Sequence, residues 1–286
     1  LWYFEAVRQY IEATSDLKTL EKLFPVLSAI IESHVSGTRY NIHVDPADGL
    51  VYGGGPGVQL TWMDAKIGDW VVTPRTGKPV EINALWINAL ESMAQFANLL
   101  HLPAARFASL SSAAKASFAK FWNADRSCLY DVIDSPGIGN DASLRPNQIL
   151  AVSLPFSPLS ADQQKAVVDI CRTELLTPFG LRSLGAHELG YIAHYRGGPR
   201  DRDAAYHQGT VWGWLLGPFA LAHFRVHRKK SEALEFLQPL AQAIDIYGLG
   251  SLAEIFDAES PHKPAGCIAQ AWTVAELLRA WKLLVA

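Results

Sequence analysis

The chain has 286 residues, of which 49% are hydrophobic and 19% charged, and its formal net charge is −3. This length and apolar content can fill a large core, and the slight acidity gives no sign of binding to nucleic acid or to an anionic membrane. No stretch approaches the roughly 18 apolar residues that a membrane span needs. We therefore expect a well-packed globular protein with neither a nucleic-acid nor a membrane partner.

The cysteines and the first residues bear on compartment and chain ends. Cys128, Cys171 and Cys267 are odd in number and far apart, with no CxxC pair. This pattern predicts free thiols in a reducing, cytoplasmic compartment and no zinc site. The chain begins LWYFEAVRQY, which has helical spacing and no Met or basic leader. We expect a piece whose own N-terminus lies upstream.

Helical periodicity dominates the sequence and predicts about nine helices in a single domain, residues 1–286. They cover residues 1–13, 17–35, 79–101, 104–122, 146–153, 160–175, 206–228, 230–246 and 268–285. Asp16 is placed to cap the second helix, which Pro25 could bend or delay. The β-type runs, such as TRYNIHV, are short and isolated.

Long irregular segments separate some of these helices, and short turns separate the others. The irregular segments cover residues 37–78, 123–145 and 177–205, with a further loop, GLGSLAEIFDAESPHKPAG, before the last helix. This alternation indicates an all-α toroid of helical hairpins with a cleft at the end that carries the long loops. A flat bundle and a solenoid are alternatives, although no fixed repeat supports a solenoid.

The long loops are rich in acids, amides and tryptophan, which suit a sugar-binding site. Carboxylates and amides bind hydroxyl groups, and indole faces stack on the C–H surfaces of pyranose rings. Cleavage of a glycoside needs only two carboxylic acids and no metal or organic cofactor. The sequence contains no GxGxxG, phosphate-loop, GxSxG or HExxH motif.

The stretch LTWMDAKIGDW contains the acid that most needs explanation. Asp64 lies among Trp62, Met63 and Ala65, and a carboxylate in apolar surroundings is costly unless it is paired, hydrogen-bonded or used. On this stretch alone, a helix cap is favoured over catalysis. Other candidate site residues also have a purely structural alternative. The tryptophans could be core residues, and His207 could be a core histidine whose hydrogen bonds are satisfied.

Several longer segments resemble a known family. They are LWYFEAVRQYIEATSD, GVQLTWMDAKIGDWVVTPRTGKPVEINALWINAL, SLRPNQILAVSLPF, LLTPFGLRSL, RDAAYHQGTVWGWLLGPF and GLGSLAEIFDAESPHKPAGCIAQAWTVAELLRAW. In this order they resemble the C-terminal amylo-α-1,6-glucosidase domain of glycogen debranching enzymes, in its bacterial form. The resemblance implies an (α/α)6 barrel. It also implies inverting hydrolysis of the α-1,6-linked glucose at branch points of an α-glucan such as glycogen or limit dextrin.

The resemblance also implies roles for two carboxylic acids. Asp64, the acid of TWMDA, corresponds to the general acid, and Glu254, in SLAEIFD, to the general base. Apolar neighbours could raise the pKa of Asp64, whereas Lys66 could instead hold it ionised. Inversion would place the two carboxyl groups about 6.5–9.5 Å apart.

The residues expected to contact substrate come from three of the loops and their flanks. Trp62 and Trp212 are expected to stack on sugar rings. Hydroxyl contacts are expected from Lys66, Arg145, Gln148, His207 and Gln208.

The chain departs from the family pattern at its N-terminus. Members of the family have twelve helices and an upstream segment resembling YPWFxDWGRDT, whereas this sequence predicts about nine helices and lacks that segment. We therefore expect a barrel short of about three N-terminal helices, whose exposed edge could favour self-association. Two alternatives stay open: a truncated, non-catalytic glucan-binding or scaffold fragment, and an (α/α)6 glycosidase or trehalase with another linkage specificity.

Overall fold

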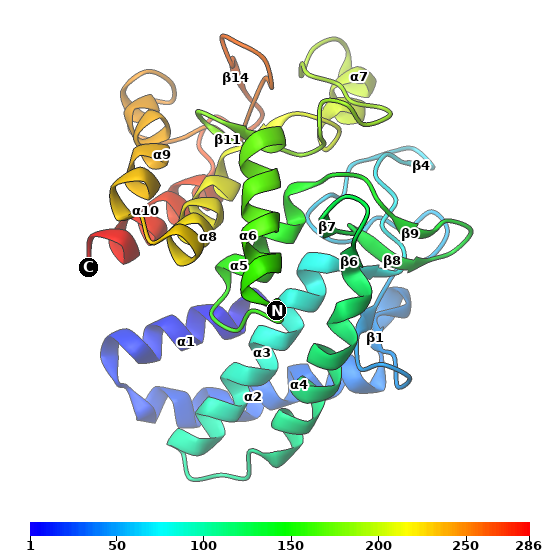
Figure 1. The fold of residues 1–286 in the computed structure, drawn as a ribbon, viewed down its shortest axis with the longest axis vertical. Helices are drawn as coiled ribbons and strands as arrows, with labels where there is room; N and C mark the ends of the chain where they lie inside the picture. The colour runs from blue at the N-terminus through cyan, green and yellow to red at the C-terminus, as the bar shows by residue number, and fades with distance from the viewer.

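The structure, a computed structural model, describes residues 1–286 and is rich in helices (Figure 1). The α-helices are α1 (Trp2–Thr14), α2 (Leu17–Ser36), α3 (Val80–Leu99), α4 (Ala105–Phe118), α5 (Leu150–Ser153), α6 (Ala161–Ile170), α7 (Pro199–Ala205), α8 (Leu216–His227), α9 (Lys230–Gln242) and α10 (Ala271–Val285). All but α7 fall within one residue of ranges that hydrophobic periodicity predicts.

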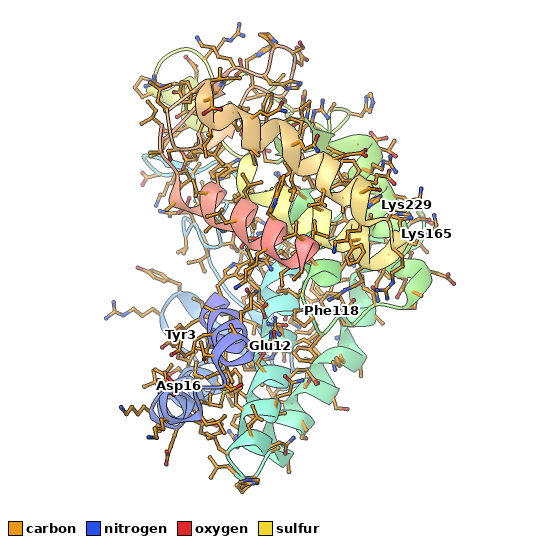
Figure 2. The ribbon with its side chains drawn as sticks, turned by 90° about the vertical axis from the view of Figure 1, so that its left-hand side faces the viewer. Tyr3, Glu12, Asp16, Phe118, Lys165 and Lys229 are labelled. Atoms are coloured by element: carbon orange, nitrogen blue, oxygen red, sulfur yellow. The ribbon has the colours of Figure 1, made fainter.

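Local signals set the first helical hairpin as expected. α1 ends at Ser15, which has a left-handed φ of 54°, and α2 begins after Asp16. The Asp16 side chain accepts a hydrogen bond from the Thr19 amide at 3.0 Å, so the predicted N-cap is confirmed (Figure 2). Pro25 does not delay α2, which starts before this residue and continues through it, whereas a bend at Pro25 stays a prediction.

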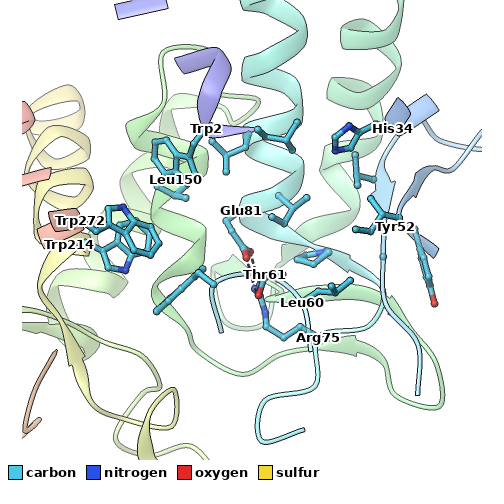
Figure 3. Close-up of a pocket in the computed structure, with 18 residues that line it drawn as sticks. Trp2, His34, Tyr52, Leu60, Thr61, Arg75, Glu81, Leu150, Trp214 and Trp272 are labelled. Atoms are coloured by element: carbon cyan, nitrogen blue, oxygen red, sulfur yellow. Dashed lines mark hydrogen bonds and ion pairs between the residues drawn. The ribbon is translucent and has the colours of Figure 1, made fainter. Parts of the chain in front are cut away.

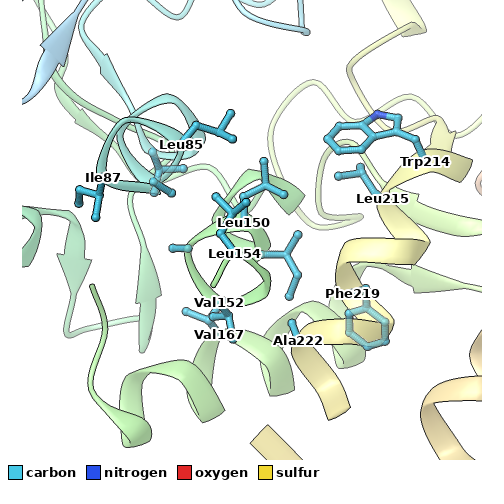
Figure 4. Close-up of a cluster of buried hydrophobic side chains, with 14 of the residues drawn as sticks. Leu85, Ile87, Leu150, Val152, Leu154, Val167, Trp214, Leu215, Phe219 and Ala222 are labelled. Atoms are coloured by element: carbon cyan, nitrogen blue, oxygen red, sulfur yellow. The ribbon is translucent and has the colours of Figure 1, made fainter. Parts of the chain in front are cut away.

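Two buried helices hold the fold together. α3 packs against α1, α2, α4 and α5, and α8 packs against α5, α6, α9 and α10. α1 to α4 occupy the lower part of both overall views, and α8 to α10 the upper part (Figure 1, Figure 2). Between them, Leu85 and Ile87 of α3, Leu150 and Val152 of α5 and Phe219 of α8 belong to one hydrophobic core cluster of 58 buried residues (Figure 4).

Short strands are more numerous than the sequence suggested, so the all-α expectation holds only as helix-rich. The strands are β1 (His43–Val44), β2 (Val51–Tyr52), β3 (Lys66–Ile67), β4 (Trp70–Val71), β5 (Lys78–Pro79), β6 (Trp122–Asn123), β7 (Cys128–Leu129), β8 (Val132–Ser135), β9 (Gly139–Asp141), β10 (Leu176–Thr177), β11 (Gly180–Arg182), β12 (Val211–Trp212), β13 (Ile255–Phe256) and β14 (Pro264–Ala265). β10 to β14 form one antiparallel sheet in sequence order. Strands of two to four residues are too short to show alternation in a sequence.

One predicted helix begins ten residues late. The sequence predicted a helix over 206–228, but α8 starts at Leu216, after a turn, β12 and a 3-10 segment, Gly213–Leu215. Val211 and Trp212 pair with β11 on one side and β13 on the other. Gly209, at φ 143°, has a conformation that a continuous helix cannot include. Pairing with distant strands therefore overrides the helical pattern.

Other helices differ only at their ends. The 146–153 segment starts as a 3-10 turn (Pro146–Ile149), the 160–175 segment ends in a π-turn (Cys171–Leu175), and 230–246 ends in a 3-10 turn (Ala243–Asp245). The region 177–205 contains β11 and α7 and is less irregular than expected.

The loops and small sheets gather on one side of the molecule. β4, β9, β11, β14 and α7 lie along the upper and right edges of Figure 1, whereas the connection between α3 and α4 lies at the bottom. This division favours the loop-bearing side as the location of a site, and a closed (α/α)6 ring stays a prediction. None of the helices combines the length and apolar character that crossing a bilayer requires.

Candidate active site

Asp64 is an exposed residue between two buried ones, just after a turn. Thr61 has a left-handed φ of 69°, and Met63 and Ala65 are buried, whereas Asp64 is exposed. The residue lies in an irregular segment before β3 and not at a helix start, so the cap interpretation was wrong.

The surroundings of Asp64 raise the pKa of its carboxyl group. Partial burial is the main cause, a backbone hydrogen bond opposes it, and the nearby negative charge of Glu254 adds to the rise. Lys66 does not oppose this shift, because its Nζ donates to the carbonyl of Gly57 at 2.8 Å and no ion pair joins it to Asp64. The alternative in which Lys66 holds Asp64 ionised is therefore wrong.

Glu254 is oriented by groups that donate to both of its oxygens. The Cys267 amide donates to Oε2 at 2.9 Å, and Gln270 Nε2 donates to Oε1 at 3.0 Å. Gly266 has φ 72°, and a Cβ at this position would lie 2.5 Å from Glu254 Oε2. Glu254, which lies just before β13, is therefore held in place by hydrogen bonds from the segment that leads into α10.

Tyr206 lies near Glu254, although sequence reasoning assigned it no role. Burial raises the pKa of this phenol most, and the neighbouring Glu254 carboxyl group and the charge of Asp64 raise it further. The phenol therefore stays protonated. Its position next to His207 in a polar segment could have marked Tyr206 as a candidate site residue. Its proximity to Glu254 could not be predicted, because the two residues are far apart in the sequence.

Aromatic rings surround Trp62 edge to face. Its ring centroid lies 5.0 Å from that of Trp212, 5.2 Å from that of Trp214 and 5.3 Å from that of His207. Trp62 is half-buried, so part of its ring is open for stacking, whereas Trp212 is only 4% exposed. The core alternative considered for Trp212 fits this burial.

Two of the expected hydroxyl-binding residues are joined beneath the loops. Arg145 is buried, and its Nη1 donates to the carbonyls of His207 at 2.8 Å and Ser183 at 3.1 Å. Its Nη2 donates to Gln208 Oε1 at 3.0 Å, and Gln208 Nε2 donates to the Val72 carbonyl at 3.2 Å. These bonds tie the first loop to the third, and direct sugar contacts from Arg145 and Gln208 stay predictions.

Gln148 and His207 lie deeper in the protein. Gln148 accepts from the Leu129 amide and donates to the Arg145 carbonyl, both at 3.1 Å. His207 is 0% exposed and stacks on Trp212 with 5.0 Å between ring centroids. Burial, then the charges of Arg145 and Arg75, lower the pKa of His207 to about 3. Both of its ring nitrogens lack a partner, so it is a buried neutral ring and not a satisfied core histidine.

Two cavities adjoin these residues. Beside Glu254 lies a pocket of ≈ 890 Å³, lined by Tyr195, Arg196, Arg202, Glu254, Asp257, Lys263, Pro264, Ala265, Gly266 and Cys267. A second, mainly apolar cavity of ≈ 300 Å³ lies between the start of α1, α3 and the tryptophans Trp62, Trp214 and Trp272 (Figure 3). Both volumes are in the range of small-molecule sites. No group of three or more His, Cys, Asp or Glu side chains could hold a metal ion.

Comparisons with known sequences point to one enzyme family. The family model for amylo-alpha-1,6-glucosidase matches residues 1–279. The glycogen debranching enzyme of Saccharomyces cerevisiae is 27% identical over 237 residues, a match that covers 68% of this chain and 15% of the yeast protein. The chain thus spans about one-seventh of that relative, and the bacterial form expected from the sequence stays a prediction.

Solved structures share the fold. The GH63 mannosylglycerate hydrolase from Thermus thermophilus in complex with Tris has a TM-score of 0.73 and 14% identity, over 98% of this chain and 75% of that chain. The same hydrolase in complex with glucose has a TM-score of 0.72 and 13% identity, over 97% of this chain and 73% of that chain. At this identity the likeness concerns the fold alone.

Proposed function

The chain belongs to the amylo-alpha-1,6-glucosidase family of glycoside hydrolases, and from that premise we propose that it releases glucose from the α-1,6 branch points of glycogen or limit dextrin. The observation that supports this most is the contrast between Asp64 and Glu254. The pKa of Asp64 is raised, whereas donors hold both oxygens of Glu254 as hydrogen-bond acceptors. A carboxyl group with a raised pKa beside a second, oriented carboxyl group is the arrangement that glycoside hydrolysis uses.

In the proposed reaction, water attacks the anomeric carbon while the glycosidic bond breaks. The Asp64 carboxyl gives its proton to the departing oxygen, and Glu254 takes a proton from the attacking water on the opposite face of the sugar. The products are free glucose with inverted anomeric configuration and the shortened glucan. Tyr206 would keep Glu254 oriented toward the water, and the exposed part of Trp62 would stack on the sugar.

The first experiment is release of glucose from a phosphorylase limit dextrin. Asp64→Asn and Glu254→Gln are each expected to lower kcat by about 10²- to 10⁴-fold, the usual contribution of a general acid or base. Asp69→Asn, at an exposed acid of the same loop, is the matched control and should retain activity. Retained activity in Asp64→Asn would contradict the proposal.

The pH profile tests the two roles separately. Because burial and Glu254 raise the pKa of Asp64, the acid stays protonated to higher pH, and kcat should fall as pH rises through that value. NMR of the first product should show β-glucose before mutarotation. Early α-glucose would contradict inversion.

One observation favours a second candidate, a glycoside with an anionic aglycone. The side chains of Arg196, Arg202 and Lys263 line the pocket beside Glu254, and Arg202 and Lys263 form no ion pair. The structural neighbours are named mannosylglycerate hydrolases, and glycerate carries a carboxylate. Assays with mannosylglycerate, trehalose and an α-1,4 oligosaccharide beside limit dextrin distinguish these specificities.

A further inference from the structure

The turn that precedes Asp64 is held from below, starting at Thr61. This residue has a left-handed φ of 69°, which is unfavourable for a β-branched side chain. Its Oγ1 accepts a hydrogen bond from Arg75 Nη1 at 3.0 Å and another from the Met63 amide at 3.3 Å. A strained turn persists only where its surroundings over-determine it, and Arg75 provides such a restraint.

The next residue, Trp62, is held through its indole nitrogen. Trp62 Nε1 donates to Asn147 Oδ1 at 2.7 Å, and Asn147 Nδ2 donates to Asp131 Oδ1 at 2.7 Å. Asp131 Oδ2 in turn accepts from Arg75 Nε at 2.8 Å. The restraint on Trp62 therefore passes through two buried side chains to the same arginine that holds Thr61.

Met63 is held through its sulfur and by burial. It is 0% exposed, and Sδ lies 3.6 Å from Asn147 Nδ2 and 3.8 Å from Arg145 Nη1. Three consecutive residues thus contact buried polar groups, and Asp64 is the first one that does not.

Arg75, which holds Thr61, is itself paired with acidic side chains. Arg75 forms a two-pronged ion pair with Glu81 in the first turn of α3, in which Nη2 to Oε2 is 2.6 Å (Figure 3). Arg145 Nε lies 3.8 Å from Asp131 Oδ2. The two guanidinium groups therefore face two carboxylates, all of them at most 6% exposed. Apart from Arg145 Nε, which has no hydrogen-bond partner, these groups are paired. Displacing one of the paired members would leave another unpaired in a buried site, which makes the network rigid.

We propose that Arg75, Glu81, Asp131, Arg145 and Asn147 form a cradle that positions the carboxyl group of Asp64 by fixing Thr61, Trp62 and Met63. These are positioning residues, since they act on the reacting carboxyl through the backbone of the turn. The proposal rests on the proposed function, because that function assigns proton donation to Asp64.

The cradle matters for catalysis because proton transfer tolerates little displacement. Productive geometry must be held to within about 0.5 Å, and an error of about 1 Å can cost about 10²-fold in rate. Asp64 has no helix or strand of its own to fix it. The three residues before it therefore determine where its carboxyl group lies relative to Glu254.

Thr61→Val tests this with the smallest change. Valine keeps the shape of threonine but removes the acceptor for Arg75. We expect kcat to fall about tenfold or more while KM changes less than about threefold, and the high-pH limb of the profile to move. Thr177→Val is the matched control. Thr177 Oγ1 also bonds an amide two residues on, at 3.4 Å, but the residue lies in β10, outside the cradle.

A second variant and a second measurement make the result independent of turnover. Asn147→Leu cuts the link between Asp131 and Trp62. In both variants, ¹³C NMR of the carboxyl groups should show the pKa of Asp64 displaced from its wild-type value, with the wild-type value kept in Thr177→Val. Because this titration needs no substrate, it tests positioning even in a protein without glucosidase activity.

The outcomes separate the two proposals. Wild-type protein that releases no glucose would contradict the proposed function while the titration still reports on the cradle. An unchanged Asp64 pKa in folded Thr61→Val and Asn147→Leu would overturn the cradle. Equal losses of kcat in Thr61→Val and Thr177→Val would also overturn it, since a general loss of stability would then explain the effect.

Discussion

Asp64 and Glu254 show how surroundings give the same functional group different properties. Partial desolvation and the field of a second carboxyl group raise the pKa of Asp64, although a backbone hydrogen bond opposes them. Glu254 receives the Cys267 amide and the Gln270 side chain. The Cys267 amide can approach Glu254 only because the preceding residue, Gly266, has no side chain.

Gly266→Ala tests that dependence. The added Cβ would lie 2.5 Å from Glu254 Oε2, so the carboxylate must move, and the φ of 72° adds about 1 kcal/mol of backbone strain. We expect kcat to fall at least about tenfold and Tm to drop by about 2–4 °C, measured by glucose release and thermal unfolding. Gly137→Ala, at φ 78° with open space around it, is the control. A similar loss of kcat in both variants would contradict displacement of Glu254.

At the scale of elements, the N-terminal turn of α3 connects the site to the core. Glu81 lies in this turn, where an acid also meets the helix dipole favourably, and it pairs with Arg75. The ion pair connects α3, a buried helix, to the irregular segment that carries Asp64.

Arg75→Met should destabilise the protein strongly. Removing the guanidinium leaves Glu81 without its ion-pair partner and Asp131 short of donors, in a site at most 5% exposed. We expect a loss of about 3–5 kcal/mol in the free energy of unfolding, measured with denaturant. Arg106→Met removes the exposed pair with Glu32 and should cost less than about 1 kcal/mol. Comparable losses of unfolding free energy in the two variants would contradict the prediction, since the buried ion pair would then contribute no more to stability than the exposed one.

Elements that depend on local signals were predictable, and those that depend on distant partners were not. The cap at Asp16 and the start of α3 follow from residues within a few positions. The late start of α8 and these short strands follow from pairing between β11, β12 and β13, which no local pattern encodes. The same limit applied to Asp64: its loop was identified, but the cap interpretation needed the structure to exclude it.

The candidate site shows the same division. Residue types and a family resemblance were enough to select Asp64 and Glu254 from the sequence. The bond from Trp62 to Asn147 and the proximity of Tyr206 to Glu254 join segments far apart along the chain. Asp131, central to the buried network, gave no signal, because an isolated acid beside hydrophobic residues has many uses.

Over the whole molecule, buried histidines make the fold sensitive to acid. His207 and His223 are both 0% exposed, and neither has a hydrogen-bond partner on either ring nitrogen. Burial is the main cause that lowers the pKa of His207 to about 3 and that of His223 to about 4. In the unfolded chain, histidine titrates near pH 6.5. The unfolded state therefore binds more protons than the folded state as pH falls below about 6.5, and stability must decrease there.

His223→Leu should remove part of this acid sensitivity. His223 packs between Phe219 and Phe236, and leucine fills similar apolar space without two unpaired nitrogens. The wild-type stability contributed by neutral His223 is present above pH 6.5 and is lost toward pH 4, by about 1–2 kcal/mol between pH 7 and pH 5. We expect the free energy of unfolding of His223→Leu to vary less over this range by that amount. His187→Leu, at an exposed position, should keep the wild-type slope. Parallel pH curves for wild type and His223→Leu would mean that His223 becomes protonated without unfolding, through access of water to the contact between α8 and α9.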